Sequence, residues 1–351
     1  MKLLALLAFV GCCIAIPGQN PNFDVKSRLV LVPVTITARN GGFVDGLEAR
    51  DFSLFDNGHP VTITVDSIGT GVAPIALAVA VQASGISSVV LEKVHKIGSM
   101  IGPLVLGERG SAAVVAFDDE VRWLQDWTSE ESRITAAFQG IRARNGKKAK
   151  LLDAAMEAIS RLSTRRSARR ILLLISESRD RSSEADLNDV AFAAQQAGVV
   201  VYAIQYSAFK TGFTRKGPES AGSVPRNEQG RPNPEYGTAS GGPPKDRYDP
   251  KIPPPEMRVD ILGALGELGR LGKEKATDIL ARETGGTTFS FARQRGLEEA
   301  IEKLGADLHA QYILSFAPQN PQPGYHTLDV RVTRPDIVIR ARPGYWAERI
   351  P

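Results

Sequence analysis

The chain has 351 residues, of which 42% are hydrophobic and 23% are charged, and its formal net charge is +4 at pH 7. This composition excludes an intrinsically disordered polymer and is sufficient for one large or two modest globular domains. The mild positive charge, with basic residues interleaved among acidic ones, argues against a nucleic-acid-binding protein.

Residues 1–19 have the pattern of a secretory signal peptide. Lys2 precedes an apolar run from Leu3 to Val10 that is too short to span a membrane. We therefore expect an exported protein, either periplasmic, in the outer envelope or secreted. Cleavage after Ala15 is the simplest interpretation, and a lipid anchor at Cys12 is the alternative. No later stretch reaches about 18 consecutive apolar residues, so we expect no transmembrane helix after signal removal.

β-strand signals open the body of the chain. Residues 29–37 (LVLVPVTIT) are rich in β-branched side chains, and Asn57-Gly58 marks a hairpin within residues 51–65. Residues 28–70 are therefore predicted to form an N-terminal β-strand unit.

Strands and helices then alternate. Residues 74–81 (PIALAVAV) are continuously apolar, as is typical of a strand covered on both faces, and apolar residues at helical spacing follow up to Ile101. Further strands are predicted at 111–117, 121–127, 171–176, 199–207 and 287–291, and further helices at 130–142, 151–163, 186–196, 258–282 and 297–309. This alternation predicts an α/β domain over residues 74–310, with a doubly wound, mostly parallel sheet and helices on both faces.

Two stretches depart from the alternation. Residues 208–257 are dominated by Gly, Pro, Ser and charged residues, which predicts a flexible surface loop. Residues 311–347 return to β signals and are predicted to form a C-terminal β-strand unit. We expect the two β units to meet, so that the α/β domain is an insertion in a small β-sandwich formed by the chain ends.

Several segments carry a family resemblance through their order. They are the polar turn QASGIS after the first apolar strand, a helix, the FDDEV hairpin, the LLDAAMEAI helix, the RRILLLISES strand and ARETGGTTF. This order resembles the von Willebrand factor type A fold. The ends, VPVTITARNGGFVDGLEARDFSLFDNG and LHAQYILSFAPQN with LDVRVTRPDIVIRARPGYWA, are similar to the bacterial VWFA-related domain proteins. The resemblance covers roughly residues 28–347 and implies a non-enzymatic protein-interaction module of the adhesion type.

Many proteins of that fold carry a metal-ion-dependent adhesion site. An Asp-x-Ser-x-Ser loop, a Thr in a second loop and an Asp in a third supply the oxygen ligands that Mg²⁺ prefers. The resemblance places these positions on Gln82, Ser84, Ile86, Ala149 and Glu177. One hydroxyl and one displaced carboxylate remain, so we expect a degenerate site that holds neither a metal nor another cofactor.

Positive charge surrounds these positions. Basic side chains in place of the ion could receive an acidic group of a protein partner through charge-assisted hydrogen bonds. The candidate partner-binding residues are Ser84, Lys147, Lys148, Lys150, Glu177, Arg179 and Arg181.

Two alternatives remain open for this edge of the sheet. Ser84, Glu177 and Asp180 could hold Mg²⁺ or Ca²⁺ in a rearranged site. The second alternative is an enzyme whose pocket lies at the same edge, although the sequence has no nucleophile–base or paired-acid signature. For two other charged segments, a plain structural role is expected. Residues 118–120 (DDE) are predicted to form a tight turn, and residues 161–170 (RLSTRRSARR) a solvated helix end rather than a site for an acidic partner or lipid headgroups.

Overall fold

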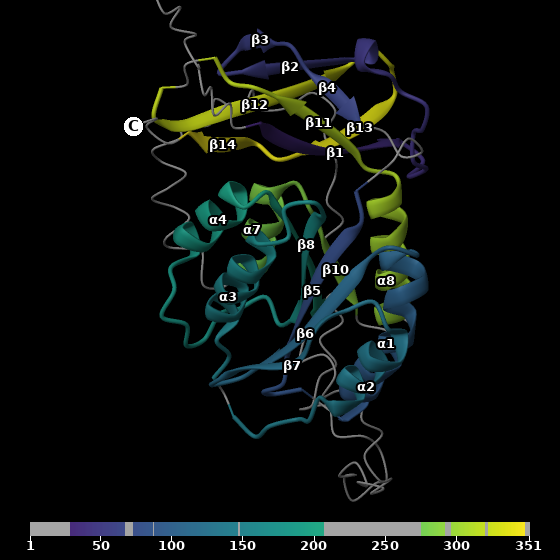
Figure 1. Cartoon of the computed structure of the whole chain (residues 1–351), viewed down its shortest axis with the longest axis vertical. Coiled ribbons are helices and arrows are strands. Elements are labelled where there is room, and N and C mark those ends of the chain that lie inside the picture. Colours follow the sequence, from purple (N-terminus) through teal and green to yellow (C-terminus); the bar gives the residue numbers. More distant parts are fainter. Residues whose placement is uncertain are drawn as a thin grey trace, which may run out of the picture.

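The computed structural model describes residues 29–66, 73–86, 88–146, 148–206, 275–291, 296–319 and 322–347 (Figure 1). The predicted signal peptide, the predicted loop at 208–257 and Lys147 lie outside these residues. None of the helices in the described part combines the length and the apolar character that crossing a membrane requires.

A six-stranded sheet forms the centre of the molecule, in the order β10-β9-β8-β5-β6-β7. All neighbouring strands are parallel except β6 and β7. The middle strand β5 is buried at every residue, because helices cover both faces of the sheet. The strands are β5 (Ile75–Gln82), β6 (Ser111–Phe117), β7 (Val121–Thr128), β8 (Arg169–Ser176), β9 (Val199–Tyr206) and β10 (Thr288–Phe291).

Two helical layers enclose this sheet. On one face lie α1 (Ser88–Ile101), a π-helical turn (Gly102–Leu106), α2 (Glu131–Gly140) and α8 (Gly296–His309), and on the other lie α3 (Leu151–Ser163), α4 (Leu187–Gln196) and α7 (Ala276–Thr284). Strand β5 directs Leu77, Val79 and Val81 to the first layer and alanines to the second. The predicted doubly wound α/β fold is therefore confirmed.

A β-sandwich built from both chain ends covers one end of the α/β domain (Figure 1). One sheet has the order β13-β1-β11-β4 and the other β14-β12-β2-β3. Their strands are β1 (Val30–Ala38), β4 (Thr64–Asp66), β11 (Tyr312–Phe316), β13 (Ile337–Ala341), β2 (Phe52–Asp56), β3 (His59–Val61), β12 (Gly324–Val332) and β14 (Gly344–Ala347), with a 3-10 turn at Ala49–Asp51. Each sheet combines N-terminal and C-terminal strands, so the predicted insertion of the α/β domain is also confirmed.

Some predicted boundaries differ from the structure. The helix predicted at 130–142 ends at Gly140, because Ile141 adopts an extended conformation and packs into the core. The helix predicted at 258–282 is observed as α7, while residues 258–274 lie outside the described part. The N-terminal strands are divided between the two sheets of the sandwich, because β1 pairs with the C-terminal strands β11 and β13.

A buried polar network joins the sandwich to the α/β domain. The hydroxyl of Tyr202 on β9 donates to Asp307 of α8 at 2.6 Å, and Asp307 also forms an ion pair with Arg340 of β13. Arg340 donates in turn to Thr35 Oγ1 on β1 at 2.9 Å. Burial and the nearby carboxylate of Asp307 raise the pKa of Tyr202. Tyr202 therefore remains a neutral donor and fixes one domain against the other.

Candidate interaction site at the carboxyl ends of the strands

Gln82 connects two loops at the carboxyl edge of the six-stranded sheet. It is the last residue of β5 and is buried. Its amide Nε2 donates to the carbonyl oxygen of Ser84 at 2.9 Å, and its Oε1 accepts from the backbone N–H of Glu177 at 3.1 Å. Because a primary amide has both a donor and an acceptor, this one side chain forms hydrogen bonds with backbone groups of both the loop after β5 and the loop after β8.

Ser84 connects the loop after β5 to the segment before α3. Its Oγ donates to the carbonyl oxygen of Lys148 at 2.6 Å. Gly85 follows with φ +67°, a left-handed conformation that favours glycine. Ile86 then packs into the core formed with α1 and α2, and Ala149 packs into the core on the opposite face. These two motif positions therefore contribute apolar packing.

Glu177 is buried and forms an ion pair with Arg181. The backbone N–H of Arg181 also donates to the carbonyl oxygen of Ala149 at 3.2 Å. The ion pair neutralises the carboxylate at the third motif position, and the backbone hydrogen bond to Ala149 ties the loop after β8 to the segment before α3.

Asp180 caps helix α3 from a neighbouring loop. Its Oδ1 accepts from the backbone N–H of Leu151 at 3.1 Å and from Ser183 Oγ at 2.6 Å. Lys150, at the helix start, makes no side-chain cap, so Asp180 supplies the acceptor that the first turn requires. Asp180 is only 3% exposed, so it is a buried structural carboxylate and not a solvated one.

The basic residues of this edge differ in whether they are paired. Lys150 Nζ lies 3.3 Å from carboxylate oxygens of both Glu184 and Asp153, and hydrogen bonds to Glu184 and then Asp153 raise its pKa. Arg181 is paired with Glu177, whereas no ion pair within the described part of the chain includes Lys148 or Arg179. Both of the latter residues are exposed. The positive charge that the sequence suggests is therefore reduced to these two side chains, with Lys147 outside the described residues.

The turn predicted at residues 118–120 is observed, and it also supports the site. Asp118 is buried and accepts two hydrogen bonds from Arg122, at 2.8 and 2.6 Å. Burial raises the pKa of Asp118, but the hydrogen bonds and charge of Arg122 outweigh it and hold the pKa well below its usual range. The carbonyl oxygen of Asp118 accepts from the backbone N–H of Lys150 at 2.8 Å, which holds the segment before α3.

The structure thus brings Gln82, Ser84, Ala149 and Glu177 into one hydrogen-bonded cluster, while Ile86 turns into the core. Among the described residues, no group of three or more His, Cys, Asp or Glu side chains is placed to hold a metal ion. The bridging role of Gln82 was missed from the sequence, although a polar residue ending a fully buried strand must find hydrogen-bond partners. We find no sequence signal for the capping role of Asp180.

No family model and no curated protein matches the chain. Similar solved structures include an aerotolerance-related membrane protein from Bacteroides fragilis, with 12% identity, a TM-score of 0.39, and 66% of this chain and 98% of that chain covered. They also include the VWA domain of SpRpn10, with 16% identity, a TM-score of 0.30, and 39% and 79% covered. A third is the vWF domain of the type V pili tip protein Mfa5 from Porphyromonas gingivalis, with 15% identity, a TM-score of 0.28, and 32% and 40% covered. These neighbours include domains of the type that the sequence resembles, and they carry no argument about the activity of this chain.

Proposed function

We propose that this chain is an exported, non-enzymatic protein-interaction module that receives a protein partner at the carboxyl edge of its six-stranded sheet without a metal ion. The observation that carries the proposal is the bridge made by Gln82 between Ser84 and Glu177. In a metal-dependent site the ion holds such loops together through shared ligands. Here a side-chain amide joins them directly, so the edge is ordered without an ion.

The residues at this edge do not fit Mg²⁺ or Ca²⁺, which require several free oxygen ligands. The hydroxyl of Ser84 donates to a carbonyl group, and the carboxylate of Glu177 is paired with Arg181. Asp180 accepts hydrogen bonds from backbone N–H groups of α3. A rearranged metal site would have to break this ion pair and this helix cap, the latter alone contributing about 0.5–2 kcal/mol. We therefore assign no metal to the site.

Lys148 and Arg179 are the side chains through which the edge would contact its partner. Both are exposed, on loops that the hydrogen bonds of Ser84 and Gln82 hold in place. A guanidinium group binds a carboxylate with two parallel hydrogen bonds, and an ammonium group adds a point charge. An acidic segment of a protein partner fits this chemistry.

The test is capture of partners by the immobilised mature chain from envelope and secreted protein fractions, with EDTA in one arm and Mg²⁺ in the other. We expect the same partner in both arms. The double variant K148E/R179E should weaken binding at least tenfold at low salt and less at high salt, because exposed charges are screened. Lys303→Glu is the control for a single charge reversal, to be compared with Lys148→Glu and Arg179→Glu taken singly, since Lys303 is an exposed cation on α8.

Two results would contradict the proposal. Unchanged affinity of the double variant would place the interface elsewhere on the molecule. Binding of Mg²⁺, Ca²⁺ or Mn²⁺ tighter than about 0.1 mM in calorimetry would restore a metal-dependent site, since weak extracellular calcium modules bind in the range of about 0.1–1 mM.

We further propose that the first segment is removed on export and that residues 208–257 form a loop within the α/β domain. Mass spectrometry of the mature N-terminus should show removal of the first segment, and a lipid-modified Cys12 would select the lipoprotein form. An intact Met1 in the cytoplasmic fraction would refute export. Limited proteolysis should cut first within residues 208–257, whose Gly and Pro content predicts a loop, and leave the two fragments associated.

A further inference from the structure

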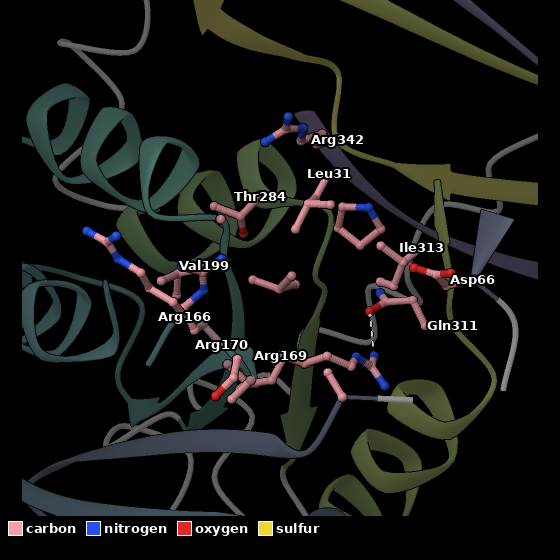
Figure 2. A pocket seen from close by; sticks show the side chains of 17 residues that line it. Leu31, Asp66, Arg166, Arg169, Arg170, Val199, Thr284, Gln311, Ile313 and Arg342 are labelled. Atoms are coloured by element: carbon pink, nitrogen blue, oxygen red, sulfur yellow. Dashed lines mark hydrogen bonds between the residues drawn. The ribbon is translucent and has the colours of Figure 1, made fainter. Parts of the chain in front are cut away.

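A cavity of about 330 Å³ lies between the β-sandwich and the amino ends of β8 and β9 (Figure 2). Leu31 and Pro33 of β1 and Ile313 of β11 line it from the sandwich, while the first residues of β8 and β9 line it from the α/β domain. The candidate interaction site is at the opposite, carboxyl edge of the same sheet. The cavity is therefore a separate feature, and its volume falls within the range of small-molecule pockets.

Four arginines line this cavity, namely Arg166, Arg169, Arg170 and Arg342, against one acidic residue, Asp66. The ion pairs formed within the described part of the chain include none of these four guanidinium groups. The run at residues 161–170 was predicted to be a solvated helix end. That prediction is wrong for Arg169 and Arg170, which begin β8 and are partly buried because the sandwich packs over the start of the strand.

Two of these arginines have a buried Nε donor without a hydrogen-bond partner. Arg342 is 5% exposed, its Nε is buried without a hydrogen-bond partner, and burial lowers its pKa to about 10. The Nε of Arg170 is also buried without a partner, and burial and then the like charge of Arg166 lower the pKa of Arg170. A buried donor without a hydrogen-bond partner is unfavourable, and neither arginine has an ion-pair partner in the described part of the chain, so both groups favour an anion in the cavity.

Arg169 is arranged differently and forms part of the wall. Its two terminal nitrogens donate to the carbonyl oxygen of Leu308 and to Gln311 Oε1, each at 3.0 Å, and Figure 2 shows the contact with Gln311. Arg169 is thereby held in place, while Arg170 and Arg342 retain unused donors.

We propose that this cavity binds a small organic anion that consists of a phosphate group and an apolar body. Guanidinium groups match phosphate oxygens with paired hydrogen bonds, and a phosphate monoester has enough charge and acceptors to serve more than one arginine. The apolar side chains of Leu31, Val200 and Ile313 complete the wall and fit a hydrocarbon or aromatic portion.

Calorimetry and thermal unfolding of the full chain with phenyl phosphate test the proposal. We expect phenyl phosphate to bind with a Kd below about 1 mM and to raise Tm, with inorganic phosphate binding more weakly and benzyl alcohol not at all. No binding of phenyl phosphate would overturn the proposal. Benzoate binding as tightly as phenyl phosphate would overturn the assignment to phosphate and indicate a carboxylate site.

Variants then localise the binding. Arg166→Gln at an exposed position and Arg170→Gln should each weaken phenyl phosphate binding at least tenfold, whereas Arg133→Gln on α2 is the surface control. Arg342→Met should abolish binding while the ligand-free Tm stays equal or rises, because an apolar chain that can still pack against Tyr345 replaces a buried charge without an ion-pair partner. Unchanged binding in the first two variants would place the anion outside the cavity. A large loss of Tm in Arg342→Met would contradict the premise that this charge has no ion-pair partner.

Discussion

Replacing Gln82 by leucine is expected to destabilise the protein by about 2–4 kcal/mol. Leucine has a similar volume and removes both hydrogen-bonding groups of a side chain that is 1% exposed. The N–H of Glu177 and the carbonyl oxygen of Ser84 then lose their side-chain partner. Each buried group left unsatisfied costs about 1–3 kcal/mol, and the greater hydrophobicity of leucine offsets part of this sum.

Urea unfolding, followed by the fluorescence of the three tryptophans, measures this change. Gln139→Leu on the exposed face of α2 is the matched control, with an expected change within about 0.5 kcal/mol. A Gln82→Leu variant as stable as the wild type would refute the conclusion that the amide ties the loops together.

The variant Gln82→Glu tests the donor role of the Gln82 amide separately from its acceptor role. The ionised carboxylate still accepts from the N–H of Glu177 but cannot donate to the carbonyl oxygen of Ser84, so the folded protein favours the protonated form. The pKa of this glutamate is then higher in the folded than in the unfolded chain. Its stability deficit should shrink as the pH falls from about 7 to about 5, whereas the deficit of Gln82→Leu should stay constant. A pH-independent Gln82→Glu deficit would contradict the donor role.

Two further predictions concern buried carboxylates. Asp118→Asn should lower the free energy of unfolding by about 2 kcal/mol at neutral pH. This loss is smaller than that expected for a fully buried ion pair, because Arg122 is about a quarter exposed. Because the folded-state pKa of Asp118 is depressed, the stabilisation from its carboxylate is lost as the pH falls below about 4. The wild type should therefore lose more stability than Asp118→Asn between neutral pH and this acidic range. Urea unfolding at neutral and at acidic pH measures the difference. Asp307→Ala should cost about 3 kcal/mol, since it leaves Arg340 and Tyr202 without their shared acceptor. Hydrogen exchange should then increase first in β13 and α8, and uniform protection as in the wild type would contradict the role of this network between the domains.

The sequence by itself determined the architecture, because hydrophobic periodicity reports local structure directly. The continuous apolar run of β5 predicted a strand covered on both faces, and the spacing of apolar residues predicted α3 at the observed bounds, Leu151–Ser163. The β signals at the two ends predicted the sandwich.

Only the tertiary structure decided which polar groups meet. The N–H of Glu177 reaches Gln82 from a distant strand, and Asp180 caps a helix that lies before it in the chain. Arg342 enters the wall of the cavity from the C-terminal segment, far from Arg170 in sequence. Such contacts depend on the packing of elements that are remote along the chain, and the periodicity of residues reports only local structure. For this reason Arg170 could be mistaken for part of a solvated helix end, although it begins β8 and the sandwich covers it in part.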